Sequence, residues 1–494
     1  MLDLRNASFT YSGQEQPALD RVSLKSPAGQ ALVVTGKSGC GKTTLSRVIN
    51  GLIPELYEGG LEGECLVDCL STGSTPISQL SRRVGSVFQD PKTQFFTTDV
   101  TSELAFPLEN AGVDRASIRA RLDQVADLFG IRRFLDRSMF ALSGGEKQLV
   151  AIASACMPGP KLLLLDEPSS NLDARAIESL GRVLAMLKER GMTMVIIEHR
   201  LYYLRDLADR FVVMDQGRVS HEFEPGQMAA LDAPARERLG LRALTLPTAG
   251  PDAAAPAVPP DDAPAHTLRI HDLSYTYHGA DRAALRVDDL EMDGRDVIGI
   301  VGRNGAGKST FAKALTGLIT GAKGARVSLD GRRLGRKDLT RASFLVFQDV
   351  NYQLFSESVA KELRLGAVGV DQARVEEVAA RLGLTDLLDR NPNPLSGGQK
   401  QRVAVGCAVL SGKRIVIMDE PTSGLDLTHM NEVTESIGYL RSLGAIVLVI
   451  SHDREFLLKT CTRFLTFEEG AITTDTKDLP DSRLGESSPA DCKP

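Results

Sequence analysis

Two stretches of the sequence have the residue types and spacing needed to bind a phosphate chain. Both match the pattern GxxxxGK[ST], at residues 36–43 and 302–309, and each follows an apolar run and precedes a helical pattern. The glycines let successive backbone N–H groups curl around phosphates, the lysine reaches the outer phosphates, and the last hydroxyl binds Mg²⁺. The residues predicted to do so are Gly36, Ser38, Gly39, Gly41, Lys42, Thr43 and Thr44, and Gly302, Asn304, Gly305, Gly307, Lys308, Ser309 and Thr310.

A pair of carboxylates follows each of these loops further along the chain, at the end of an apolar run. Asp166 and Asp419 are predicted to hold Mg²⁺ directly or through water. The next residues, Glu167 and Glu420, are candidate bases that orient and polarise an attacking water. An isolated Asp-Glu pair is more often a solvated turn, and its place downstream of a phosphate loop favours the chemical interpretation.

The chain carries the same unit twice. Lys42 and Lys308 are 266 positions apart, and Asp166 and Asp419 are 253 apart, so the second copy is shortened between them. Loops tolerate such changes in length. The repeat therefore predicts a duplicated domain.

Each copy alternates strand-like and helix-like segments. An opening β segment precedes a strand that enters the glycine loop, and a helix-rich middle is followed by apolar strands at 161–168 and 193–199, or at 414–421 and 445–452. This order predicts an α/β fold with a mostly parallel sheet covered on both faces, whose ligands bind at the carboxyl ends of the strands.

Composition predicts where the domains end. Residues 1–244 and 267–474 form the two domains, and the Pro/Ala-rich stretch 245–266 is expected to be an extended tether. The polar tail at 475–494 is expected to be disordered.

Charge and cysteine usage exclude other classes of protein. A net charge of −6 argues against a broad nucleic-acid surface, and no nucleic-acid partner is expected. The seven cysteines are scattered, without the paired CxxC units of a zinc site. No apolar run is long enough to span a bilayer and the first residues do not read as a signal peptide, which predicts a location in the cytoplasm.

The stretches LSGGEKQ (142–148) and LSGGQKQR (395–402) resemble the signature of ATP-binding cassette (ABC) ATPases. Physically, a serine and two glycines that open a helix make a site for an anion. In this family two domains pack head to tail and the signature of one completes the nucleotide site of the other, so the resemblance implies that the two domains of this chain pair with each other. The residues concerned are Ser143, Gly144, Gly145, Glu146, Ser396, Gly397, Gly398 and Gln399.

The same resemblance implies the fold, the cofactors and further site residues. It implies two P-loop NTPase (ABC ATPase) domains, each with a mostly parallel sheet, an antiparallel β subdomain and a helical subdomain, and it implies ATP with Mg²⁺. A tyrosine would stack on adenine, a glutamine would sense Mg²⁺ and the γ-phosphate, and a histidine would contact the γ-phosphate. The matching residues are Tyr11, Tyr277, Gln89, Gln348, His199 and His452. A half-buried strand tyrosine and a capped strand end remain the plain alternatives for the tyrosines and histidines.

The two copies depart from the family pattern differently. Leu149 stands where the second copy has Arg402, and "EHR" at 198–200 stands where the second copy has "SHD". Neither change removes a phosphate ligand. We therefore expect both sites to hydrolyse ATP, but unequally. Cys40, inside the first loop, is expected to favour its thiolate because of Lys42 and the loop N–H groups, although a small residue chosen for fit is an equal alternative.

The stretches 87–106 and 346–363 point to a subfamily. A glutamine followed five residues later by a second glutamine and an aromatic or apolar pair resembles the ATPase component of energy-coupling factor (ECF) transporters, including cobalt and vitamin importers. That resemblance implies integral membrane partners, a coupling subunit and a substrate-binding subunit, at the cytoplasmic face of the membrane. The acidic residues expected to pair with an arginine of a partner helix are Asp99, Glu103, Glu357 and Glu362, with the alternative that they are helix-start acids favoured by the helix dipole.

Other classes of tandem ATPase remain as alternatives. Fused ATPases of monosaccharide importers share the layout but usually have one weakened site. Soluble tandem ATPases that work on ribosomes share the motifs but need a charged helical linker, whereas residues 245–266 are rich in Pro and Ala. A scaffold that binds ATP without turnover is disfavoured by the two glutamates and two histidines of the predicted sites.

Overall fold

The computed structural model describes residues 1–170, 172–246, 265–320 and 325–480. It divides into two compact units that follow the two copies of the repeat, the first formed by Met1–Leu246 with the short segment Asp426–Thr428 and the second by the rest of the chain. Most of the expected tether lies outside the described residues. Asp475, expected in the tail, belongs to the last strand, and residues 481–494 lie outside the described part. No helix within the described ranges is long and apolar enough to cross a membrane.

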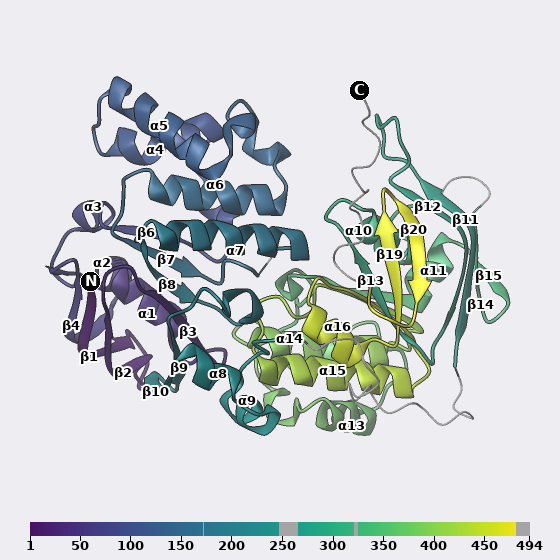
Figure 1. Ribbon diagram of the computed structural model, residues 1–494. Coiled ribbons are helices and arrows are strands. Elements are labelled where there is room, and N and C mark those ends of the chain that lie inside the picture. Colours follow the sequence, from purple (N-terminus) through teal and green to yellow (C-terminus); the bar gives the residue numbers. More distant parts are fainter. Residues whose placement is uncertain (171, 247–264, 321–324, 481–494) are drawn as a thin grey trace, which may run out of the picture. The chain divides into compact units, whose positions relative to one another are not determined.

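The first unit contains two sheets (Figure 1). An antiparallel sheet has the order β2-β1-β4-β5, with bounds Leu19–Ser26, Leu2–Tyr11, Gly59–Val67 and Leu70–Ser71. The main sheet has the order β10-β9-β3-β8-β7-β6, with bounds Arg218–Phe223, Arg210–Asp215, Ala31–Gly36, Thr193–Ile197, Leu162–Asp166 and Val84–Val87. All of its pairings are parallel except that of β10 with β9.

Hydrophobic patterning explains these two sheets. Every residue of β3, β7 and β8 is buried, as expected for parallel strands covered on both faces, whereas β1 alternates between buried and more exposed residues. One core packs the main sheet against the helical part of the unit, and a second packs its other face against the antiparallel sheet.

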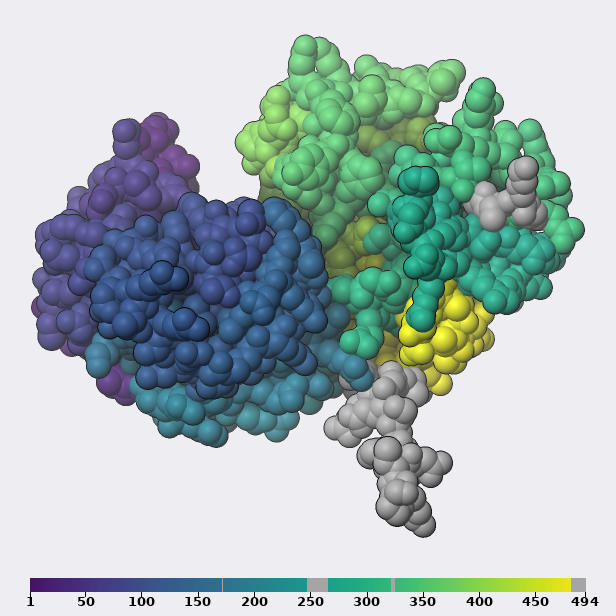
Figure 2. Space-filling model, turned by 90° about the horizontal axis from the view of Figure 1, so that it is seen from above, coloured from purple at the N-terminus to yellow at the C-terminus, as the bar shows by residue number. Residues whose placement is uncertain are grey.

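The helices of the first unit cover both faces of the main sheet. The longer ones are α1 (Lys42–Ile49), α4 (Val100–Asn110), α5 (Arg115–Phe129), α6 (Gly144–Cys156) and α7 (Ala174–Glu189). The shorter ones are α2 (Leu52–Glu55), α3 (Ile77–Leu80), α8 (Pro225–Ala229) and α9 (Ala233–Leu239). In Figure 1, α7 runs along the sheet and α6, α4 and α5 are stacked beyond it, and Figure 2 looks down on this stack, coloured blue. It is the expected helical subdomain.

The second unit repeats this plan, but its strands join in one sheet. The order is β15-β14-β11-β12-β20-β19-β13-β18-β17-β16, with bounds Arg332–Leu334, Arg326–Leu329, Thr267–Tyr275, Leu285–Asp293, Ala471–Thr476, Arg463–Glu468, Val297–Gly302, Ile446–Ile450, Ile415–Asp419 and Ser343–Val346. A single pairing, Arg286 with Ala471, connects the antiparallel part to the rest. Its helices are α10 (Lys308–Leu315), α11 (Arg336–Ala342), α12 (Val359–Arg364), α13 (Gln372–Arg381), α14 (Gly397–Leu410), α15 (Leu427–Ser442) and α16 (Arg454–Thr460). The predicted fold class is confirmed in both units.

Candidate functional site

The first glycine loop connects β3 to α1 and is pressed against the protein on one side. Gly36, Gly39 and Gly41 have φ angles of +134°, +76° and +103°, which residues with a side chain rarely adopt. A Cβ atom on Gly36 would lie 2.2 Å from the carbonyl oxygen of Met214, and one on Gly41 would lie 2.4 Å from that of Ala18. Beyond its chain neighbours, no described atom lies within 4 Å of the Cβ position of Gly39. The loop is therefore open on one side, as a cradle for an anion must be.

The second loop, between β13 and α10, has the same shape. A Cβ atom on Gly302 would lie 2.3 Å from the carbonyl oxygen of Phe467, and one on Gly307 would lie 2.7 Å from that of Ala284. Gly305, at φ +83°, again has no described atom within 4 Å beyond its neighbours. Both loops fit a chain of phosphates because only glycine can follow this path.

A lysine lies inside each loop. Lys42 is buried, and its Nζ donates to the carbonyl oxygens of Gly36 at 3.0 Å and Lys37 at 2.7 Å. Lys308 donates to the two equivalent carbonyls at 2.6 and 2.9 Å. The remaining predicted residues of the two loops and their helices are Ser38, Thr43, Thr44, Asn304, Ser309 and Thr310, and they lie at equivalent places.

The aspartates lie beside the N-terminal part of the helix that follows each loop. Asp166, the last residue of β7, accepts a hydrogen bond from Ser46 Oγ at 3.3 Å, and Asp419 accepts one from Ser309 Oγ at 3.4 Å. Burial raises the pKa of both carboxyls above the usual range, against the opposing effects of hydroxyl donors and lysines. Carboxylate and hydroxyl oxygens are the ligands that Mg²⁺ prefers, so the donor set fits that ion.

The two candidate bases have a strained backbone. Glu167 and Glu420 have φ angles of +45° and +50°, in the left-handed region that a glutamate occupies only when its surroundings hold it there. Each backbone N–H donates to the carbonyl oxygen of the last residue of the neighbouring strand, Ile197 or Ile450, at 2.8 Å. The strained backbone thus occurs at the two residues that the sequence predicts to act as bases.

The structure brings the predicted glutamine and histidine of the first unit to the same glutamate. Gln89 Nε2 donates to a carboxylate oxygen of Glu167 at 2.7 Å, and His199 Nε2 lies 3.6 Å from the other oxygen. In the second unit His452 Nε2 lies 3.5 Å from Glu420.

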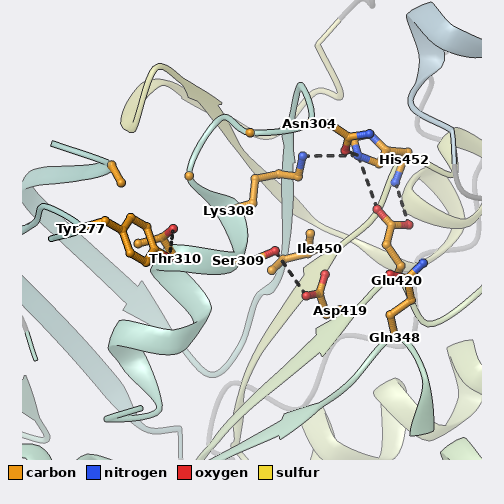
Figure 3. Close-up of a pocket in the computed structure, with 13 residues that line it drawn as sticks. Tyr277, Asn304, Lys308, Ser309, Thr310, Gln348, Asp419, Glu420, Ile450 and His452 are labelled. Atoms are coloured by element: carbon orange, nitrogen blue, oxygen red, sulfur yellow. Dashed lines mark hydrogen bonds and ion pairs between the residues drawn. The ribbon is translucent and has the colours of Figure 1, made fainter. Parts of the chain in front are cut away.

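Figure 3 shows a pocket of the second unit, which Glu420 and His452 help to line. It encloses about 360 Å³ between the glycine loop, the strand ends and Tyr277. Within it, His452 Nε2 lies 3.1 Å from Asn304 Oδ1 and 3.3 Å from Lys308 Nζ. Gln348, Asp419 and Glu420 complete the wall at the strand ends, whereas the pocket does not include the signature residues of the same unit, 396–399.

The signature serines cap helices, as their residue type predicts. Ser143 caps α6 and Ser396 caps α14, each in a capping box with the residue three positions later. The second glycine of each signature permits close packing, because a Cβ atom on Gly145 would lie 2.7 Å from Ala176 and one on Gly398 would lie 2.9 Å from His429.

Sequence reasoning did not find the role of the residue before each histidine. Glu198 is buried, and its carboxylate accepts from the backbone N–H of His199 at 2.7 Å and of Arg200 at 3.1 Å, and from Tyr203 Oη at 2.9 Å. Burial, followed by the charges of Glu198 and Asp166, raises the pKa of Glu167 to about 8, against Lys42 and Gln89.

The second unit has no such charge at the corresponding position. Ser451 Oγ donates to a carboxylate oxygen of Glu420 at 3.3 Å and accepts from the backbone N–H of Asp453 at 3.1 Å. The difference between "EHR" and "SHD" therefore gives the two bases different neighbours. Glu167 has a carboxylate near it, that of Glu198, whereas Glu420 has a hydroxyl donor, that of Ser451.

The prediction that four acidic residues face a partner is wrong for two of them. Glu103 and Glu362 are buried, with exposed fractions of 3% and 1%. Glu103 accepts from the backbone N–H groups of Phe96 at 3.1 Å and Thr97 at 2.9 Å, and Glu362 accepts from that of Phe355 at 2.9 Å. Both carboxylates fold the preceding loop and are not available to an arginine from outside. Asp99 caps α4, and Glu357 is exposed and pairs with Lys361.

The expectation that Cys40 favours its thiolate is also corrected. Its side chain is buried, and burial raises the pKa of the thiol above its ordinary value although Lys42 opposes this effect. Desolvation outweighs the cation, so the neutral thiol is favoured. The fit of a small residue accounts for Cys40.

The departure after the first signature has a structural counterpart. Leu149 packs against the hydrophobic core of the first unit, whereas Arg402 lies 3.5 Å from Glu432 in an ion pair. The substitution changes packing behind the signature helix and leaves the signature itself intact.

Comparisons with known proteins agree with this geometry. The family model described as "ABC transporter" matches the chain twice, over residues 19–170 and 285–423. A protein of Treponema denticola, described provisionally as an ABC transporter ATP-binding protein, is 42% identical over 96% of this chain and 97% of its own length. One of Methanosarcina acetivorans with the same description is 31% identical over 96% of this chain and 85% of its own.

A solved structure shares the fold. It is a complex of the archaeal ribosomal stalk protein aP1 with the archaeal ribosome recycling factor aABCE1, and the matched chain has a TM-score of 0.64 and 23% identity over 96% of this chain and 90% of its own.

Proposed function

Because this chain belongs to the ABC transporter family, as a tandem ATPase that binds ATP with Mg²⁺, we propose that it is the motor of an ECF-type importer. It would act at the cytoplasmic face of the membrane and energise uptake of a vitamin or a metal ion. Its partners would be a coupling subunit and a substrate-binding subunit.

A pair of exposed aromatic loops, residues 94–99 and 353–358, carries this proposal. In each loop a glutamine side chain holds the start, since Gln94 accepts from the N–H of Phe88 at 3.1 Å and Gln353 from that of Phe347 at 2.7 Å. The buried glutamates described above hold the end of each loop. These bonds keep Phe96 and Phe355 exposed, by 75% and 77%.

Further aromatic side chains extend these loops. Phe96 stacks on Phe106 with centroids 5.1 Å apart, and Phe140, 81% exposed, is brought beside the loop by a bond from Met139 N to Thr98 O. In the second unit Tyr352 is 73% exposed. Exposed aromatic residues that hydrogen bonds hold in place are typical of a binding surface. A helix of a membrane subunit could pack its apolar side chains against them.

Within each unit we assign roles from the geometry and the family resemblance. Glu167 and Glu420 act as bases toward the attacking water, and the histidine and glutamine of each unit sense the γ-phosphate. The hydroxyl, glutamine and aspartate ligands of Mg²⁺ are Thr43, Gln89 and Asp166, and Ser309, Gln348 and Asp419. We further propose that each signature serves the nucleotide bound by the other unit.

Co-purification tests the transporter assignment. The tagged chain is purified from detergent-solubilised membranes of its native host, and the double variant Phe96→Ser/Phe355→Ser is compared with Leu443→Ser, which changes an exposed apolar residue outside the loops. We expect integral membrane subunits with the wild type and the control, and their loss with the double variant.

Two results would overturn the proposal. Recovery of ribosomal subunits in place of membrane subunits would favour the ribosome-associated alternative. Membrane subunits retained by the double variant would show that the aromatic loops do not bind them.

A further inference from the structure

The tyrosine at the end of β1 is held by a cluster that lies mostly outside the phosphate-binding motifs. Tyr11 Oη lies 3.2 Å from Thr44 Oγ1 and accepts a hydrogen bond of 2.8 Å from a guanidinium nitrogen of Arg47, in the last turn of α1. The same guanidinium lies over the ring of Tyr57, 4.1 Å from its centroid. The Tyr57 ring meets that of Tyr11 edge-on at 6.3 Å, and Phe9 meets it edge-on at 4.8 Å from another side.

The second unit keeps only part of this arrangement. Tyr277 Oη lies 3.2 Å from Thr310 Oγ1, and the ring of Tyr275 meets Tyr277 edge-on at 4.9 Å. Lys313 stands at the position of Arg47, and within the described part of the chain it makes no hydrogen bond to Tyr277. The sequence has no aromatic residue at 318–325, the stretch after α10 that corresponds to the one with Tyr57.

This difference changes how freely each tyrosine moves. Tyr277 is 42% exposed, and among the described residues its hydroxyl contacts Thr310, whereas Tyr11 is half-buried and bounded by an arginine and two rings. A charged donor makes a stronger hydrogen bond than a neutral one, and a cation over an aromatic face adds to it. A ring that is already ordered loses less conformational entropy when a ligand stacks on it.

We propose that Arg47 and Tyr57 are positioning residues that hold Tyr11 ready for an adenine ring, so that the first site retains ATP longer than the second. This inference rests on the adenine-stacking role that the family resemblance implies for Tyr11 and Tyr277. It predicts a difference in nucleotide retention that arises from contacts to the adenine ring and not from the phosphate loops.

Photolabelling with 8-azido-ATP resolves the two sites because the reactive group is on the base. The full-length protein is loaded with the magnesium complex on ice, chased with excess MgATP for different times and irradiated. Peptides from residues 1–244 and 267–474 are then quantified by mass spectrometry. We expect label to remain about tenfold longer on the first domain, the ratio that one such interaction would produce.

Variants separate positioning from general stability. Arg47→Met and Tyr57→Ala are expected to shorten retention at the first domain to that of the second. Tyr57→Phe keeps the ring under the guanidinium and is expected to retain nucleotide as long as the wild type does. Lys313→Met should leave both domains unchanged. Magnesium tripolyphosphate, which has no base, should compete at the first site equally well in wild type and Arg47→Met.

Equal retention at both domains of the wild type would overturn the inference, as would a parallel loss of tripolyphosphate binding in Arg47→Met. If Tyr11→Ala retains nucleotide as the wild type does, the stacking role itself fails. If Tyr11→Ala loses it and Arg47→Met does not, only the positioning role fails.

Discussion

At the scale of single residues, the two units differ most at the residue that precedes the histidine. Glu198 places a second buried carboxylate near Glu167, and Ser451 places a hydroxyl donor against Glu420. A carboxyl that is protonated at the working pH cannot accept a proton until it ionises, so the raised pKa lowers the share of Glu167 that is ready to act as a base. The first unit is thereby expected to turn over more slowly.

The pKa of Glu167 has a consequence for folding. Ionising this carboxyl costs more in the folded protein than in the unfolded chain, so stability falls as pH rises from about 4.5 to about 8, the two pKa values. Glu167→Gln removes this cost. In the nucleotide-free protein we expect the variant to have the higher Tm, with a larger gap at pH 8.5 than at pH 6, as followed by calorimetry.

Glu198→Gln provides the matched comparison. It keeps the size of the side chain and removes the charge that, after burial, contributes most to the raised pKa of Glu167, so the pH dependence of Tm should become shallower than in the wild type. A gap between Glu167→Gln and wild type that is the same at both pH values would contradict this account.

At the scale of elements, each aromatic loop is closed by a glutamate from the following helix. Glu103 lies in the first turn of α4 and Glu362 in α12, and each turns back to the N–H groups before it. The helix start thus sets the shape of the loop, and the exposed phenylalanine follows from it.

Removal of Glu103 tests this relation. Glu103→Ala leaves the N–H groups of Phe96 and Thr97 without their buried acceptor, which costs about 2–4 kcal/mol. Tm should fall by several degrees, and cleavage by a protease selective for aromatic residues should increase at Phe96. Glu357→Ala, an exposed acid of the second unit, should change neither. Unaltered Tm and cleavage in Glu103→Ala would refute the role.

These elements also show what the sequence can and cannot predict. The apolar stretches at 161–168 and 193–199 predict strands correctly, although the strands themselves are shorter, because both faces of a parallel strand are buried. The sequence does not show whether Glu103 points outward or back to its loop, because the packing of α4 against α6 decides its burial. The Arg47–Tyr57 contact was also missed, since it joins two side chains that share no motif.

At the scale of the whole molecule, duplication has preserved the phosphate-binding framework and changed what surrounds it. The glycine loops and lysines have equivalent geometry in both units, and in each a strand-end carboxylate accepts from a serine hydroxyl, that of Ser46 in the first and of Ser309 in the second. The side chains around the adenine-stacking tyrosine differ between the units, and so does the residue before the histidine. We therefore expect the two ATP sites of this chain, which are alike in their ligands, to differ in retention and turnover.

Steady-state ATP hydrolysis by Glu167→Gln, Glu420→Gln and the double variant tests this central claim most directly. Each single variant should lose part of the wild-type rate, Glu420→Gln should lose more than Glu167→Gln, and the double variant should be inactive. Identical losses in the two single variants would contradict the inequality of the sites, and activity retained by the double variant would contradict the assignment of the bases.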